Sequence, residues 1–194
     1  MPAALSGILV SPVFWMGNAI LVNEKNGYSN MAILDTAMQW QQIILFIPAA
    51  LSQLLLPILA SYSNDKNNFK KTFNYNLYLN IFIVLVLCLL IAFTSELIMG
   101  LYGKNFKFGS LVLILITWSC LLMIVSSLIG QSLIAKEKVW VGLSFNITWG
   151  VFFIFLVDYF VIGSQMGVEG YSYAYLFSYM ILMIINVIYH KIKK

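Results

Sequence analysis

Residues 81–93 read Ile-Phe-Ile-Val-Leu-Val-Leu-Cys-Leu-Leu-Ile-Ala-Phe, and every side chain in this stretch is apolar. The stretch belongs to a run at 72–95 that contains no Asp, Glu, Lys, Arg or His. A helix needs about 17–25 such residues to cross the hydrocarbon core of a bilayer. A strand of a membrane barrel would instead alternate apolar and polar residues over about ten positions. The stretch therefore predicts a membrane-spanning helix.

Five more runs without a charged residue or His lie at 1–23, 36–64, 108–135, 139–157 and 170–189. Hydrophobic residues make up 61% of the 194 residues and charged residues only 9%, against about 45–50% and about 25% in soluble domains. A soluble fold would need far more polar surface. The sequence predicts an all-α, polytopic membrane protein whose single domain is a bundle of six transmembrane helices. We expect these helices at about 3–22, 31–60, 77–93, 110–135, 141–162 and 171–189.

The lysines are shared unevenly between the two sides of the predicted bundle. The links after the second and fourth helices and the carboxy-terminal tail hold Lys66, Lys70, Lys71, Lys136, Lys138, Lys191, Lys193 and Lys194. The remaining links hold only Lys25, Lys104 and Lys107. An excess of lysine marks the cytoplasmic side of a membrane protein, so both termini are expected in the cytoplasm. Because two termini on one side require an even number of helices, the charge pattern also supports six.

Three prolines lie inside the predicted spans. Pro12 is in the first helix, and Pro48 and Pro57 are in the second. Each proline removes a backbone donor and clashes with the preceding turn, so we expect kinks at these positions. Broken helices are common in membrane transporters, although proline is also simply more frequent in membrane helices than in soluble ones.

A row of polar side chains runs along the second predicted helix. Its members follow one another at offsets of 4, 7 and 18 residues, and they are Asp35, Gln39, Gln42 and Gln53. At 3.6 residues per turn these positions share one face. Polar groups are costly against lipid, so this face is expected to turn toward the bundle interior or a wet cavity.

Two acids are candidates for coupling transport to a proton or cation. Asp35 and Asp158 each lie in or beside an apolar stretch, near the outer ends of their helices. A proton-coupled carrier needs a carboxylate that is alternately exposed, but an acid near the membrane surface can also simply face water. Asn18, Asn146 and Trp149 are further pathway candidates, with bundle packing as the alternative for Trp149. Ser126 and Gly130, four residues apart, predict close helix packing.

The sequence offers no set of residues for enzyme chemistry. Its single His, His190, has no acid nearby in the tail, no two acids share a motif, and no Gly-rich phosphate loop is present. No His or Cys set has metal-ligand spacing, and Cys88 and Cys120 lie within apolar runs as small buried residues. We expect no enzyme activity, no cofactor, no metal site and no nucleic-acid partner.

Several motifs resemble those of bacterial polysaccharide (O-antigen-type) flippases in order and spacing. Residues 1–15 resemble the seventh helix of that family, and 26–59, with Phe-Ile-Pro-Ala-Ala-Leu-Ser-Gln at 46–53, resemble the eighth. Residues 101–106, Leu-Tyr-Gly-Lys-Asn-Phe, resemble the link after the ninth, and 167–170, Gly-Val-Glu-Gly, resemble the link into a closing helix. The chain is similar to the C-terminal six-helix lobe of the multidrug/oligosaccharidyl-lipid/polysaccharide exporter superfamily.

The resemblance implies alternating access by two six-helix lobes that move undecaprenyl-diphosphate-linked oligosaccharide repeat units across the bacterial inner membrane for surface polysaccharide biosynthesis. Neutral hydrogen bonds to sugar hydroxyls would come from Asn18, Gln39, Gln42, Gln53 and Asn146. The implied partners are membrane lipids, the lipid-linked substrate, a missing N-terminal lobe or partner chain, and a polysaccharide polymerase. This chain departs from the family because it has no Arg, whereas family cavities are commonly lined by basic residues, which the other lobe would have to provide.

Two alternatives stay open beside the flippase. One is a lobe of a cation-coupled multidrug exporter of the same superfamily, which would need a carboxylate near mid-membrane. The other is an inactive truncated membrane fragment, favoured by the Met that stands directly before Pro2.

Overall fold

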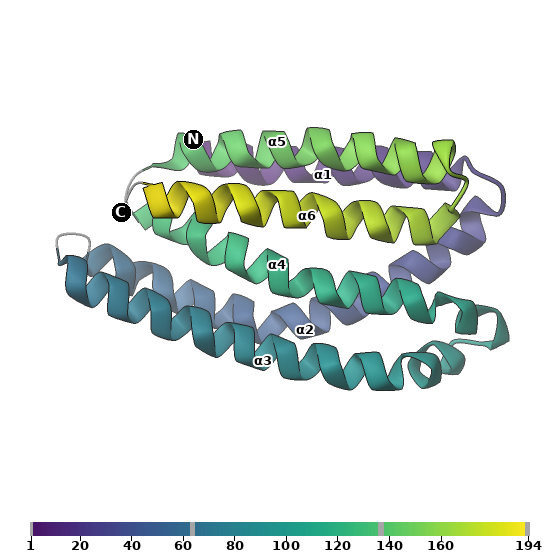
Figure 1. Ribbon diagram of the computed structural model, residues 1–194, viewed down its shortest axis with the longest axis horizontal. Coiled ribbons are helices and arrows are strands. Elements are labelled where there is room, and N and C mark those ends of the chain that lie inside the picture. The colour runs from purple at the N-terminus through teal and green to yellow at the C-terminus, as the bar shows by residue number, and fades with distance from the viewer. Residues whose placement is uncertain (1, 63–64, 136–137, 193–194) are drawn as a thin grey trace.

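The computed structural model describes residues 2–62, 65–135 and 138–192. Its elements are α1 (Pro2–Val22), α2 (Gly27–Ser61), α3 (Lys66–Leu101), the 3-10 helix η1 (Lys104–Gly109), α4 (Ser110–Ala135), α5 (Val139–Val157), the π-helical turn η2 (Asp158–Gly163) and α6 (Gly167–Ile192). The helices run along the long axis of the molecule, and both chain ends lie at the same end of the bundle (Figure 1). The prediction of an all-α bundle of six helices is confirmed.

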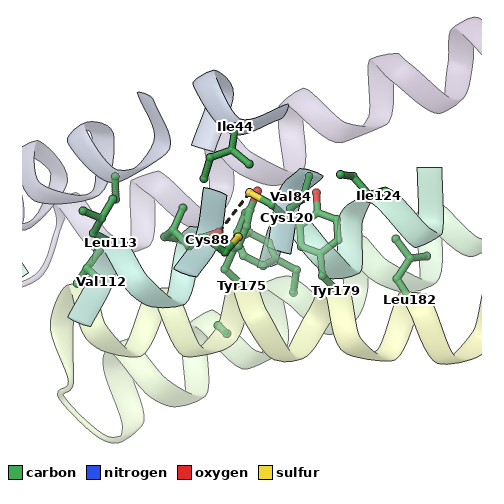
Figure 2. Packing of buried hydrophobic residues seen from close by; sticks show 14 of the residues in the cluster. Ile44, Val84, Cys88, Val112, Leu113, Cys120, Ile124, Tyr175, Tyr179 and Leu182 are labelled. Carbon is green, nitrogen blue, oxygen red and sulfur yellow. Dashed lines mark hydrogen bonds between the residues drawn. The ribbon is translucent and has the colours of Figure 1, made fainter. Parts of the chain in front are cut away.

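α4 is the central helix of the bundle. It packs against α6 on one side and against α2 and α3 on the other, while α1 packs against α5 (Figure 1). Figure 2 shows core side chains of α2, α3 and α6, among them Ile44, Val84 and Tyr175, gathered around α4. Cys88 and Cys120 are both free and buried in this core, as the sequence predicted.

Large apolar side chains are exposed along the outer surface of the bundle. Phe46, Phe82, Phe93 and Phe155 are 74%, 67%, 88% and 65% exposed. Soluble proteins rarely expose large contiguous apolar patches, whereas lipid chains are as apolar as these side chains. Within the described residues, five helical segments are long and apolar enough to span a membrane, and α1 adds the shorter apolar segment Val10–Val22. The surface is therefore that of a multi-pass membrane protein.

The three prolines lie inside helices without ending them. Pro12 is within α1, and Pro48 and Pro57 are within α2. Figure 1 shows α2 following a curved path that carries it from the α1 side of the molecule to the α3 side. Proline is a common cause of such bending because it interrupts the backbone hydrogen-bond ladder. The assignment of the bend to particular prolines stays a prediction.

The limits 77–93 that the sequence predicts for the third helix are wrong, because α3 spans Lys66–Leu101. Asp65 caps the start of α3, where one carboxylate oxygen accepts hydrogen bonds from two backbone amides, each at 3.1 Å. Phe69 and Phe73 follow within the first turns and are buried in the core. A capped start and two buried rings thus extend the helix through a segment whose polar residues resemble a link.

The ends of other helices also differ from the sequence prediction. α2 begins at Gly27 instead of 31, and α6 spans Gly167–Ile192 instead of 171–189. Gly167 has a φ of 54°, a left-handed conformation that suits glycine, and it starts α6 directly after a sharp turn. The predicted helix 141–162 is divided into α5 and the π-helical turn η2.

Candidate functional site

Four polar side chains form one exposed row along α2, which we call the α2 polar face. They are Asp35, Gln39, Gln42 and Gln53. The prediction that this face could turn into the bundle is wrong for this lobe, because Leu34, Ala37 and Ile44 occupy the buried side of α2. The other predicted environment, a wet cavity, stays a prediction.

Gln41 is a buried polar residue that the sequence analysis missed. It lies among the α2 polar residues in sequence, but its side chain is 5% exposed and reaches the core. Its Oε1 accepts a hydrogen bond from the Tyr175 hydroxyl at 3.1 Å, and its Nε2 lies 3.2 Å from the Met123 sulfur. The sequence does contain a signal that Gln41 is buried, because Ala37, Gln41 and Ile44 repeat at the spacing of a buried helix face.

Asn18 joins α1 to α6. The hydroxyl of Tyr171 donates a hydrogen bond to Asn18 Oδ1 at 2.8 Å, and Tyr171 is fully buried. Asn18 itself is half-buried. The side-chain carbonyl of this pathway candidate is therefore engaged inside the lobe.

Trp149 lies in an aromatic cluster between α1, α5 and α6. Its ring stacks on Phe153 with centroids 5.6 Å apart and meets Phe14 edge-on at 5.4 Å. Trp149 is 2% exposed and Phe153 is 0% exposed. The structure thus places Trp149 in the packed core, where edge and offset contacts between rings are favourable.

The two coupling candidates lie at the surface of the lobe. Asp35 belongs to the α2 polar face, and Asp158 is the first residue of η2; both are exposed. Among the residues that the structure describes, the buried polar side chains include no Asp or Glu. A carboxylate enclosed within this six-helix lobe is therefore not seen in that part of the chain.

A cavity of about 390 Å³ lies between α4, α5 and α6, with Val10 of α1 also in its lining. It is formed by the end of α4 and the start of α5, at the end of the bundle that holds the termini (Figure 1). Asn146, half-buried on α5, is the predicted site residue that lines it. Gly130 also lines it, and a Cβ at Gly130 would meet no atom within 4 Å. The prediction of close helix packing is therefore wrong at Gly130.

No protein-family model matches this chain. Curated relatives include the EPS I polysaccharide export inner membrane protein EpsE of Ralstonia solanacearum, 24% identical over 156 residues, which are 79% of this chain and 36% of that protein. EpsE of Ralstonia nicotianae is 37% identical over 60 residues, which are 31% of this chain and 14% of that protein.

Solved structures share the fold at low sequence identity. An outward-facing multidrug resistance MATE family transporter of the MOP superfamily has a TM-score of 0.88 at 12% identity, covering 99% of this chain and 44% of that one. A MOP superfamily transporter from Pyrococcus furiosus, with a binding pocket of reverse polarity, has a TM-score of 0.86 at 13% identity and the same coverage.

The comparisons confirm the resemblance seen in the sequence. This chain is similar to a polysaccharide export membrane protein and has the fold of part of a MOP superfamily transporter. It spans less than half the length of these relatives, 36% of EpsE and 44% of the MATE transporter.

Proposed function

We propose that this chain is the C-terminal lobe of a two-lobe flippase that moves undecaprenyl-diphosphate-linked oligosaccharide repeat units across the bacterial inner membrane for surface polysaccharide biosynthesis. The observation that carries the proposal is the coincidence of two similarities in one chain. Its fold corresponds over 99% of its length to 44% of a MOP superfamily transporter, and its relative in sequence is a polysaccharide export protein. The other lobe comes from a second segment or a partner chain.

The α2 polar face supports a cavity shared with that second lobe. Gln39 and Gln42 expose their amides on this lobe, and an amide left without hydrogen bonds in hydrocarbon is unfavourable. A water-filled space bounded by a second lobe would hydrate these groups. Neutral amides both donate and accept hydrogen bonds, so this face suits the hydroxyl groups of a sugar.

The diphosphate of the substrate would contact the other lobe. The α2 polar face carries the negative charge of Asp35, which repels phosphate, and the chain contains no Arg. Arg is the residue that binds phosphate in bidentate geometry. In this proposal, this lobe holds the uncharged sugars and the second lobe holds the charged diphosphate.

The proposed transport cycle is a rocking of the two lobes that exposes the shared cavity to each side of the membrane in turn. With both termini in the cytoplasm, the end of the bundle that holds them faces the leaflet where the substrate starts. Asp35, on the exposed face of α2, is the coupling residue that this arrangement favours over Asp158, because it shares its face with the proposed sugar contacts.

A second candidate function is drug export, because one of the structural relatives is a multidrug resistance MATE family transporter. A cation-coupled drug exporter needs an ionisable group within the membrane interior, and Asp35 on the α2 polar face would serve either candidate. The relative that is similar in sequence over 79% of this chain is a polysaccharide export protein, whereas the MATE transporter shares the fold at 12% identity. We therefore rank drug export second.

The test is deletion of the gene, followed by measurement of lipid-linked repeat units in each membrane leaflet. The proposal expects repeat units to accumulate in the inner leaflet and surface polysaccharide to fall. Unchanged outward movement with loss of drug resistance would favour the second candidate. Unchanged movement with unchanged resistance would identify the chain as an inactive membrane fragment.

A further inference from the structure

The cavity inside the lobe is separate from the α2 polar face. Its lining comes from the last turns of α4, the first turns of α5, the α6 residues Tyr179, Leu182 and Asn186, and Val10 of α1. Figure 2 shows Tyr179 and Leu182 projecting from α6 toward α4. α4 and α5 each pack against α6 more extensively than against each other, which leaves the cavity between them. At about 390 Å³ it has the size of a small-molecule site, about 300–1,000 Å³.

The lining of the cavity carries no charged side chain and combines polar residues with a larger number of apolar ones. Its hydrogen-bonding residues are Ser126, Ser127, Gln131, Asn146, Tyr179 and Asn186. The remaining lining residues are apolar or glycine, and none is an acid or a base. Ser127 and Ile134 are exposed, so the cavity opens at the surface along α4. Such a lining suits a neutral ligand that has both hydrogen-bonding groups and apolar faces.

Two polar atoms in this lining are buried without a partner. The hydroxyl of Ser126 and Oε1 of Gln131 have no hydrogen bond within the described part of the chain, and Ser126 is only 8% exposed. Buried polar groups in proteins are nearly always hydrogen-bonded, so each exception needs an explanation. A ligand whose groups donate to Gln131 and exchange a hydrogen bond with Ser126 supplies one.

Two glycines keep the cavity open. A Cβ at Gly130 or at Gly142 would meet no atom within 4 Å, although both lie inside helices, where glycine is unfavourable. Close helix contact explains other glycines in this chain, since a Cβ at Gly150 would lie 2.9 Å from Val13 Cγ2. Packing offers no such reason at Gly130 and Gly142, and both border the same cavity.

We propose that this cavity binds a neutral, polyhydroxylated group, namely a sugar residue. Hydroxyl groups donate and accept hydrogen bonds, which matches the two unpartnered atoms, and apolar lining residues such as Met123, Leu133 and Leu182 suit the C–H groups of a pyranose. An acyl chain would leave Ser126 and Gln131 without partners. A single water, with a share of liquid volume of about 30 Å³, is far smaller than the cavity.

The inference rests on the proposed function for the source of the sugar, a lipid-linked repeat unit on the cytoplasmic side. The chemistry of sugar binding is inferred from the residues that line the cavity. Sugar binding in this cavity would hold part of the substrate within one lobe before it reaches the face shared with the second lobe.

The test uses the purified full-length chain in nanodiscs and ligand-observed saturation-transfer NMR with methyl glucoside, N-acetylglucosamine and the charged glucuronate. We expect saturation transfer to the two neutral sugars and at least tenfold less to glucuronate. Gly142→Leu fills the cavity and is expected to weaken sugar binding at least tenfold. Gln131→Leu removes the acceptor at similar volume and is expected to weaken it about tenfold. Ser144→Leu, at an exposed position of α5 outside the cavity, is the matched control and should leave binding unchanged.

Absence of saturation transfer in the unmodified chain, or sugar binding that Gly142→Leu does not change, would overturn the inference. A lipid detected by native mass spectrometry, expelled by Gly142→Leu and retained by Gln131→Leu, would also overturn it, because it would identify an acyl-chain site. The leaflet measurement is independent of these readouts. If the chain binds no sugar but translocation still depends on it, only the proposed sugar site is rejected. If the cavity binds sugar but translocation does not depend on the chain, only the proposed flippase function is rejected.

Discussion

The hydroxyl of Tyr175 on α6 donates a hydrogen bond to Oε1 of Gln41 on α2, across 3.1 Å in the core. Both residues are at least nine-tenths buried, at 1% and 5% exposure. The bond links α2 and α6, which lie on opposite sides of α4 (Figure 1). The sulfur of Met123 on α4 contacts Gln41 Nε2. The hydrogen bond between Tyr175 and Gln41 is a polar contact between helices in a lobe whose other contacts are mostly apolar.

Tyr175→Phe should lower the free energy of unfolding by about 1 kcal/mol, because it removes one buried hydrogen bond and leaves Gln41 Oε1 unpaired. The measurement is SDS-induced unfolding of the chain in detergent. Gln41→Leu together with Tyr175→Phe should cost less than the two separate losses added together. Gln42→Leu, on the exposed side of α2, is the control, and an equal loss there would contradict the account.

Substitution of two glycines should have opposite effects on stability. A Cβ at Gly17 would lie 2.8 Å from a ring carbon of Phe153, whereas one at Gly130 would meet nothing within 4 Å. Gly17→Ala should therefore destabilise the lobe by about 1–3 kcal/mol through overpacking. Gly130→Ala should stabilise it by about 0.5–1 kcal/mol through helix propensity. The same unfolding assay compares them, and a destabilising Gly130→Ala would show that the cavity is not open.

The helix count and the fold could be predicted because they depend on hydrophobic runs, which are written directly in the sequence. The limits of α3 could not, because the polar segment at its start is held in helix by the Asp65 cap and by burial of Phe69 and Phe73. Burial is a tertiary property, and a charge-rich segment between two apolar runs resembles a link until its neighbours are known.

Asp65→Ala should loosen the first turn of α3, because the backbone amides of Asn67 and Asn68 lose their acceptor. Loss of such a cap costs about 0.5–2 kcal/mol. Hydrogen exchange at Asn67 and Asn68 should accelerate, while exchange in the middle of α3 should stay slow. Asp65→Asn retains an acceptor and should behave nearly as the unmodified chain; unchanged exchange in Asp65→Ala would contradict the cap.

The sequence predicts which residues of the candidate site share a face of α2, but it does not predict whether that face is buried or exposed. Helical spacing placed Gln39 and Gln42 on one face, and the structure keeps them together. That face is exposed on this lobe because apolar residues and Gln41 occupy the core side of α2. A single-helix pattern identifies which residues share a face, but the neighbouring helices decide which face is buried. The cavity beside Gly142 is lined by residues of four helices, α1, α4, α5 and α6, so no local pattern predicts it.

This lobe alone should not move a lipid-linked sugar, since the α2 polar face would lack its opposite wall. The measurement is reconstitution of the purified chain into vesicles with a fluorescent lipid-linked oligosaccharide and a membrane-impermeant quencher. Fluorescence accessible from one side should stay constant over the assay. Co-reconstitution with a first six-helix lobe should produce exchange between leaflets. Fast exchange with this chain alone would contradict the two-lobe proposal.

The proposed function requires that this chain, together with a second lobe, moves lipid-linked repeat units through contacts on the α2 polar face. The most direct test measures outer-leaflet repeat units in cells that lack the chain and are complemented with the unmodified gene, with Gln39→Leu combined with Gln42→Leu, or with the exposed control Ile43→Leu. Full restoration is expected with the unmodified gene and with the control. At least a tenfold deficit is expected with the double variant at equal protein level. Normal outer-leaflet repeat units in cells without the chain would contradict the claim.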